Sequence, residues 1–227
     1  MHTQTYIKAV VLFLLLVSTS VGAVLIEQNW AVNTAIPDND DTGLADTVVI
    51  SSMADTIVSI EVDLKISGVS SSSPAFGGDL FVTLQNEDSG FAVLLNRVGK
   101  TSTNPFGFDM NGFDVTFTST GDDIHLAEDH SPSFDSEDRL IGDWGVDGRN
   151  VDPDVVLDTD PRTAGLDTIV GSDPNGSWTL FVADTSANGT ATLDSWGVTI
   201  QAIPEPNFFA MLGSILALVM FIRREKR

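Results

Sequence analysis

The clearest hydrophobic pattern in the chain lies in residues 56–67, which read TIVSIEVDLKIS. Apolar side chains recur at every second position, with polar or charged ones between them: Val58, Ile60, Val62, Leu64 and Ile66 alternate with Ser59, Glu61, Asp63 and Lys65. A two-residue period is typical of a strand with one buried face and one face in water. The pattern therefore predicts a half-buried β-strand.

Shorter apolar runs repeat this theme along the chain, at residues 47–51, 80–84, 91–95, 113–119, 178–183 and 195–200. Clusters of Gly, Asn, Asp, Ser and Pro separate most of them, and no internal segment has a 3.6-residue apolar stripe. Several short strands without helices predict an all-β, antiparallel β-sandwich. Residues 120–176 are rich in Asp, Gly and Pro, and we expect long surface loops there with one or two short strands.

The first 23 residues have the layout of a secretory signal peptide. Lys8 precedes the apolar stretch Ala9–Val17, and small residues lead up to Ala23. The apolar stretch is short for a membrane span, and we expect a signal helix that signal peptidase removes between Ala23 and Val24. The alternative is a buried first strand or helix.

The last residues form a second apolar appendage. Phe208–Ile222 is mostly apolar, and a basic tail follows it: Arg223, Arg224, Lys226 and Arg227. As a helix, these fifteen residues reach about 22 Å, short of the roughly 30 Å hydrocarbon core, so we expect a marginal membrane helix with its basic end in the cytoplasm. The predicted domains are a signal peptide (1–23), a β-sandwich (24–203) and a C-terminal signal (204–227).

The central domain is strongly acidic. Residues 24–203 carry 30 acidic and six basic side chains, which leaves 24 net negative charges. Such a surface repels nucleic acid and attracts divalent cations, so we expect no nucleic-acid partner. The chain has no cysteine, which excludes thiol catalysis, disulfides and cysteine-based metal sites.

Residues 36–46, IPDNDDTGLAD, space oxygen-bearing side chains like the first part of an EF-hand loop. Val49 stands where an EF-hand has its bidentate Glu, and no flanking helices are predicted, so this is not an EF-hand. Calcium binding and a plain polar turn both remain open for the segment.

No catalytic pattern is present. The two histidines beyond the signal, His125 and His130, lie in the acidic loop region, and neither GxSxG nor HExxH occurs. We therefore expect no enzymatic activity. A hydrolase that uses acidic residues or histidines of the loop region is the remaining catalytic alternative.

The residues from 175 to 200 resemble the closing hairpin of the P domain, or Homo B domain, which accompanies subtilisin-like proprotein convertases. The matching positions are Asn175, Gly176, Trp178, Leu180, Val182, Asp184, Gly189, Leu193, Trp196, Val198 and Ile200. Residues 35–40, 58–67 and 78–84 match upstream parts of the family pattern, so the resemblance covers about 36–201. It implies a jelly-roll β-sandwich that often binds calcium, here at Asp38, Asp40, Asp79 and Asp184.

The chain also departs from that family. Ser67 stands where the family commonly has a histidine, the loop to Asp79 is longer than usual, and residues 120–172 do not align. No subtilisin domain fits between Ala23 and Ile36, so the protease activity does not carry over.

The C-terminal residues resemble the PEP-CTERM sorting signal of Gram-negative bacteria that produce exopolysaccharide. The motif is Pro204, Glu205 and Pro206, followed by the apolar segment and the basic tail. The resemblance implies cleavage near the triplet by an exosortase; the alternative is a permanent single-span anchor.

Together these features predict an exported, non-catalytic module that passes through an inner-membrane intermediate to the cell surface or extracellular matrix. Its expected partner is an extracellular polysaccharide or an envelope protein. An alternative is a calcium-dependent, lectin-like protein that binds carbohydrate through exposed aromatic side chains, with Trp144, Phe134 and Phe106 as candidates.

Overall fold

The computed structural model describes residues 22–70, 72–87 and 90–204. The predicted signal helix, the C-terminal hydrophobic helix, Glu205, Pro206 and the basic tail lie outside these residues. Within the described part of the chain, no helix is long and apolar enough to cross a membrane. One compact unit begins at Val24 and contains every strand named below.

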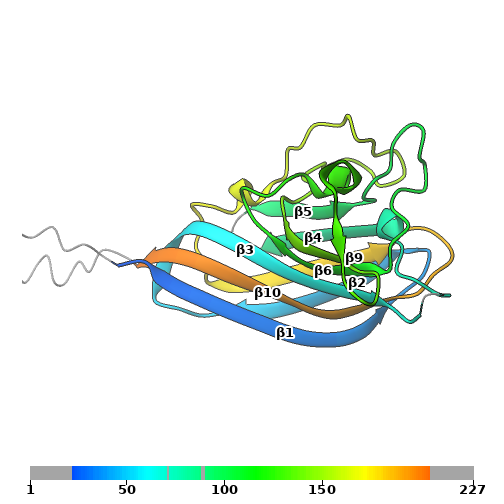
Figure 1. Cartoon of the computed structure of the whole chain (residues 1–227). Helices are drawn as coiled ribbons and strands as arrows, with labels where there is room; N and C mark the ends of the chain where they lie inside the picture. The colour runs from blue at the N-terminus through cyan, green and yellow to red at the C-terminus, as the bar shows by residue number, and fades with distance from the viewer. Residues whose placement is uncertain (1–21, 71, 88–89, 205–227) are drawn as a thin grey trace, which may run out of the picture. The chain divides into compact units, whose positions relative to one another are not determined.

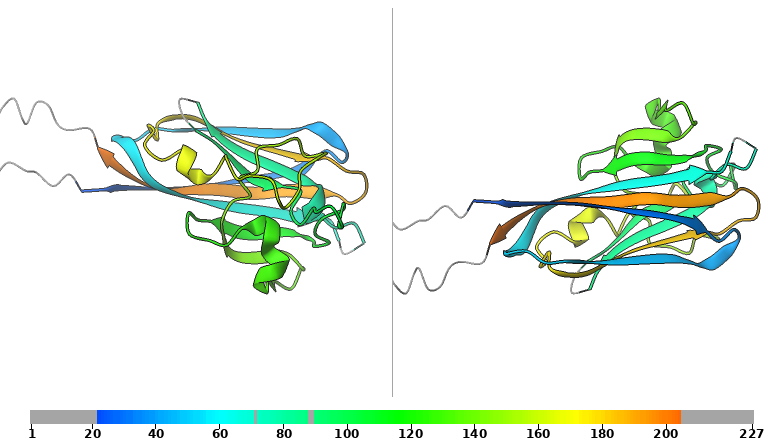
Figure 2. Two further views of the ribbon diagram at one scale, coloured as in Figure 1. Left: turned by 90° about the horizontal axis from the view of Figure 1, so that it is seen from above. Right: turned by 90° about the horizontal axis from the view of Figure 1, so that it is seen from below.

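The described residues form two sheets that pack face to face (Figures 1 and 2). Sheet A has six strands in the order β1 (Val24–Ile36), β10 (Ala191–Pro204), β3 (Ala54–Gly68), β6 (Gly112–Phe117), β8 (Leu140–Trp144) and β7 (Ser133–Phe134). Sheet B has four, in the order β2 (Asp40–Ile50), β9 (Gly176–Asp184), β4 (Leu80–Asn86) and β5 (Phe91–Asn96). Three short 3-10 helices connect them: η1 (Gly77–Asp79), η2 (Ile124–His130) and η3 (Leu166–Thr168). The all-β sandwich prediction is confirmed.

One strand pair differs from the expected antiparallel arrangement. β6 and β8 run parallel, with Phe113 opposite Leu140 and Phe117 opposite Trp144. Parallel neighbours need a long crossover connection, and residues 118–139 supply one that contains η2 and β7. The loop region predicted at 120–176 therefore also completes sheet A, through β7 and β8.

The alternation in residues 56–67 decides which face of β3 enters the core, with one exception. Ile60, Val62, Leu64 and Ile66 are buried as predicted. Val58 is 50% exposed, and Ile57 is buried in its place. The pairing of β3 with β10 shifts register at Gln201 and Ala202, and this irregularity reverses the facing near the start of the strand.

The prediction that the two strands within residues 175–200 pair with each other as a hairpin is wrong. β9 pairs with β2 and β4 in sheet B, whereas β10 pairs with β1 and β3 in sheet A. The turn between them therefore crosses from one sheet to the other. Trp178 and Trp196, one on each strand, are fully buried and belong to the core between the sheets.

β1 carries too few core residues to be recognised by alternation. Of its thirteen residues only Ile26 and Ile36 are buried, and Trp30 is half-buried against Trp196, with ring centroids 4.6 Å apart. β1 begins and β10 ends at the same end of the sandwich, and Val24 lies opposite Ala202 (Figure 1). We call this the terminal end.

Candidate functional site

Several of the predicted metal ligands gather at the end of the sandwich opposite the terminal end. Asp184 ends β9 and lies opposite Leu80 of β4, the residue that follows Asp79 of η1. Arg97, just after β5, places its guanidinium 3.8 Å from the carboxylate of Asp79. Asp79, Arg97 and Asp184 are all buried, so the ends of three neighbouring strands of sheet B form a closed charged cluster.

In this cluster it is unfavourable for the carboxylates of Asp79 and Asp184 to be ionised at the same time. Burial raises the pKa of Asp184 to about 7, and the charges of Asp79 and Asp38 add to the rise, while the Ser186 N–H opposes it. Burial also raises the pKa of Asp79 above its ordinary value, against the opposing charge of Arg97. The charge of Asp38 thus raises the pKa of both Asp79 and Asp184, and the charge of Asp79 raises the pKa of Asp184.

Asp40 does not share in this coupling, although β2 pairs it with Asp184. Its carboxylate accepts hydrogen bonds from the Thr42 hydroxyl (2.6 Å) and the Thr42 N–H (2.9 Å), and these bonds lower its pKa. The EF-hand-like spacing of residues 36–46 does not mark a continuous loop, because β2 begins at Asp40 and contains the second part of this segment. Asp46, its last acidic residue, accepts a hydrogen bond from the buried Trp196 indole at 2.7 Å.

The carboxylates around Arg97 outnumber its single positive charge, and such an excess of negative charge favours the binding of a cation. However, no group of three or more His, Asp or Glu side chains in the described part of the chain has the geometry to hold a metal ion. Calcium binding at Asp38, Asp40, Asp79 and Asp184 therefore stays a prediction that needs its own measurement.

A second charged network is buried between η2 and the segment after β8. His125 Nδ1 lies 2.6 Å from Asp147 Oδ2, and its Nε2 lies 2.9 Å from the carbonyl oxygen of Lys100. Arg149 contacts Asp147 at 3.3 Å and Asp123 at 2.9 Å. His125, Asp147 and Arg149 are at most 2% exposed, so these charges stabilise one another away from water.

The surroundings of His125 favour the protonated form of its imidazole. Burial lowers its pKa, but the hydrogen bond to Asp147 and the charge of that carboxylate outweigh burial and raise it. Both ring nitrogens face acceptors, so both serve as donors. Neither nitrogen is available to accept a proton from a nucleophile, which removes His125 from the hydrolase alternative.

His130 is in a different position, at the end of η2. Its Nδ1 lies 3.4 Å from Asp122, and both side chains are well exposed, at 38% and 68%. This surface pair resembles the buried pair in residue type but not in environment.

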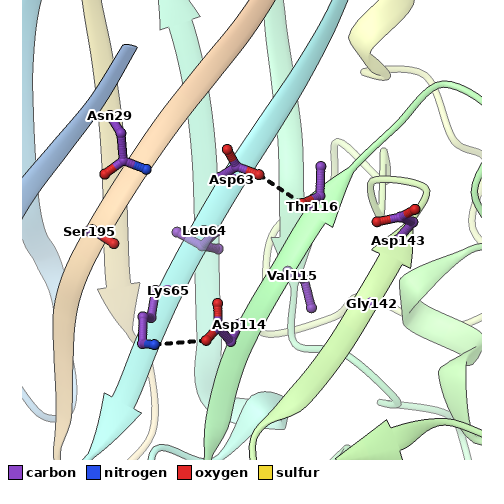
Figure 3. Close-up of a pocket in the computed structure, with 10 residues that line it drawn as sticks. All are labelled: Asn29, Asp63, Leu64, Lys65, Asp114, Val115, Thr116, Gly142, Asp143 and Ser195. Carbon is purple, nitrogen blue, oxygen red and sulfur yellow. Dashed lines mark hydrogen bonds and ion pairs between the residues drawn. The ribbon is translucent and has the colours of Figure 1, made fainter. Parts of the chain in front are cut away.

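A groove of about 250 Å³ crosses the outer face of sheet A, and sequence reasoning did not single it out (Figure 3). Its lining comes from five strands: Asn29, Asp63, Leu64, Lys65, Asp114, Val115, Thr116, Gly142, Asp143 and Ser195. Figure 3 shows Lys65 turned toward Asp114, at 2.7 Å, and Thr116 donating to Asp63, also at 2.7 Å. Three carboxylates and one ammonium leave the groove with an excess of negative charge.

The aromatic side chains proposed as carbohydrate platforms do not line this groove. Trp144 is 6% exposed and its indole donates to the carbonyl of Ile141, so it is a core residue and not a platform. Phe106 and Phe134 are 78% and 42% exposed. Of the three candidates, these two keep a face that a ligand can reach.

The polar residues of the groove had a visible signal in the sequence. Asp63 and Lys65 are the polar half of the alternation in residues 56–67, which predicted a face in water. The alternation does not say which strands flank that face, so the contributions of Asn29, Asp143 and Ser195 were out of reach. The buried network gave no signal, because Asp and Arg in a loop region ordinarily indicate solvent.

The family model of the proprotein convertase P-domain matches residues 151–200. The match covers 50 of the 227 residues and includes all of β9 and the first part of β10. It supports the P-domain resemblance for this part of the chain.

No curated protein matches the chain. Among solved structures, the chain is similar to the serine protease of Aeromonas sobria in complex with the chaperone ORF2, with a TM-score of 0.44 and 14% identity over 80% of this chain and 27% of that chain. It is also similar to the Aeromonas sobria serine protease alone, with a TM-score of 0.43 and 14% identity over 79% of this chain and 27% of that chain. The chain thus spans about a quarter of the length of these proteins, and a likeness of this extent says nothing about activity.

Proposed function

We propose that this protein is an exported, non-catalytic P-domain module that acts by binding in the cell envelope or extracellular matrix. The P-domain match over residues 151–200 carries the proposal, because this domain is a helper module and not a catalytic one. The burial of His125 between two hydrogen-bond acceptors also supports a non-catalytic module, because neither ring nitrogen is free to act as a base.

Sorting by an exosortase is the second part of the proposal. Its support is the order of the C-terminal residues: the Pro-Glu-Pro triplet, the apolar segment Phe208–Ile222 and the basic tail. The triplet begins at Pro204, which is the last residue of β10. Pro204 lies opposite Ala54 of β3. A cleavage after this residue would leave every strand of the sandwich in the released product.

We expect the double variant Glu205→Ala/Pro206→Ala to remain full-length in the membrane fraction of an exosortase-carrying host, whereas the parent chain is shortened and leaves that fraction. The variant spares Pro204 and therefore leaves β10 intact. Immunoblots of cell fractions measure the result. The control Glu225→Ala removes a charge from the tail without touching the triplet and should be processed normally. A parent chain that stays full-length in the cytoplasm would show that the sorting proposal is wrong.

Polysaccharide binding along the groove of sheet A is a second candidate function. The groove presents hydroxyl, amide, carboxylate and ammonium groups from strands held in a sheet, and such groups hydrogen-bond to sugar hydroxyls. Without an aromatic side chain in the lining, recognition would rest on hydrogen bonds and not on stacking.

Asp63 and Glu61 provide a matched test of this candidate, because both point out from β3 but only Asp63 lines the groove. We expect Asp63→Asn to weaken binding to soluble bacterial polysaccharide by about tenfold, the effect of losing one charge-assisted hydrogen bond. Glu61→Gln should bind like the parent chain. Isothermal titration with and without calcium measures both variants, and equal affinities for the two would exclude the groove as the binding site.

A further inference from the structure

Exposed apolar side chains are concentrated at the terminal end of the sandwich. Ten large hydrophobic residues are exposed among those that the structure describes, and six of them belong to this end: Leu25, Val49, Met53, Val58, Val170 and Ile203. We call these six the terminal apolar residues. Met53 is 90% exposed and Val49 is 73% exposed, which is a poor arrangement for a surface that faces only water.

The strand pairing places these residues together. Leu25 lies opposite Gln201 of β10, and Val58 sits at the register shift on the other side of Gln201. Ile203 follows two positions along β10, on the same face. These three side chains therefore lie on one face of β1, β10 and β3, with Gln201 between Leu25 and Val58.

The other three residues come from connections at the same end. Val49 and Met53 flank the turn from β2 into β3. Val170 precedes Gly171, whose N–H donates to the carbonyl of Ile57 near the start of β3. The apolar surface thus involves both sheets at the end where β1 begins and β10 ends.

We propose that the terminal apolar residues rest on the surface of a lipid bilayer while the chain is anchored, so that the sandwich stands end-on. This inference rests on the proposed membrane insertion of Phe208–Ile222. Only three residues separate Pro204 from Phe208, and the four Cα–Cα steps between these two residues span at most about 14 Å when fully extended. A headgroup layer of roughly 5–8 Å per side takes up much of that length, so Pro204 is held close to the interface.

Charge decides which lipid suits this end. Asp55 and Asp173 lie at the terminal end, and the domain as a whole is strongly acidic. An anionic surface would repel it, so the favoured bilayer is zwitterionic and the contact is apolar. A partner protein on the same surface is the competing explanation, and the experiment below separates the two.

The absence of cysteine allows a single label to be placed at either end of one strand. Met53 precedes β3 and Val69 follows it, both are well exposed, and the fifteen residues of β3 separate them by roughly 50 Å. The full chain carrying Met53→Cys or Val69→Cys is labelled with an environment-sensitive fluorophore and reconstituted into phosphatidylcholine vesicles. Some of the lipids carry a nitroxide on the headgroup, which quenches nearby fluorophores.

We expect the chain to float with the vesicles, the label at position 53 to lose most of its emission, and the label at position 69 to keep it. Flotation without quenching at either position would overturn the end-on contact and leave membrane insertion intact. Quenching at both positions would overturn it too, since the sandwich would then lie on its side. Emission at position 53 that depends on protein concentration and not on the nitroxide would point to a protein partner instead. Failure to float would overturn both this inference and the proposed insertion.

Discussion

Asp147→Asn is expected to destabilise the domain by about 3–5 kcal/mol, because it removes a buried carboxylate that contacts both the imidazole of His125 and the guanidinium of Arg149. Asp147 accepts from His125 and from the N–H of Asn96 through one oxygen, and from Arg149 through the other. The side-chain NH2 of an asparagine at this position would face one of the N–H groups that now donate to the carboxylate of Asp147, and two donors cannot form a hydrogen bond with each other. Thermal or denaturant unfolding measures the loss, which corresponds to a fall in Tm of roughly 10 °C for a domain of this size.

Asp122→Asn is the matched control, since Asp122 pairs with His130 on the surface. Exposed ion pairs contribute at most about 1 kcal/mol, so this variant should unfold close to the parent chain. Similar losses for the two variants would contradict the claim that burial gives the Asp147 network its weight.

The network also predicts a pH dependence. The folded chain raises the pKa of His125, so the folded state binds a proton more tightly than the unfolded state does. Its contribution is complete below about pH 6.5 and is lost as pH rises through the higher folded pKa. Asp147→Asn should reduce this loss.

The second large effect is expected at Asp184, where substitution should stabilise the protein at alkaline pH. Its folded pKa of about 7 lies above the ordinary value of 3.8, so between these values the folded state holds a proton that the unfolded state has released. Stability therefore falls as pH rises through this window, by up to about 4 kcal/mol. Asp184→Asn removes the ionisation, and we expect its unfolding free energy to exceed that of the parent chain at pH 8 but not at pH 4.

Unfolding in the presence of a chelator measures this effect, with Glu61→Gln as a control that removes one acidic group from an exposed site. A variant less stable than the parent at pH 8 would contradict the unfavourable buried charge. Repeating the comparison in saturating calcium tests the calcium prediction separately. Bound calcium would raise the Tm of the parent chain and reverse the sign of the Asp184→Asn effect, whereas an unchanged Tm would show that the calcium prediction is wrong.

Alternation in the sequence located strands more reliably than it located their partners. Each predicted run overlaps an observed strand, because a strand that buries one face needs apolar residues at every second position, and a strand buried on both faces, such as β5, is a continuous apolar run. The hairpin prediction failed on the same evidence. β9 and β10 both bury tryptophans, but they approach the core from opposite sheets, and a two-residue period is identical in either case.

The candidate sites show the same division. The resemblance selected Asp79 and Asp184, and the structure brings both to one buried cluster. It also selected Asp40, whose carboxylate is engaged by Thr42 instead. Arg97 was not selected, because its proximity to Asp79 depends on how β4 and β5 pair.

The sequence by itself determined that this protein is an acidic, cysteine-free, all-β domain with apolar segments at both ends, since composition and local periodicity are written directly in the order of residues. Only the tertiary structure decided which strands are neighbours, which polar side chains are removed from water, and where the exposed apolar residues collect. The physical reason is that burial and the strength of a charge depend on what the rest of the chain places around a residue. His125 and His130 lie five positions apart in the same acidic segment, yet one is sealed between two acceptors and the other is exposed on the surface.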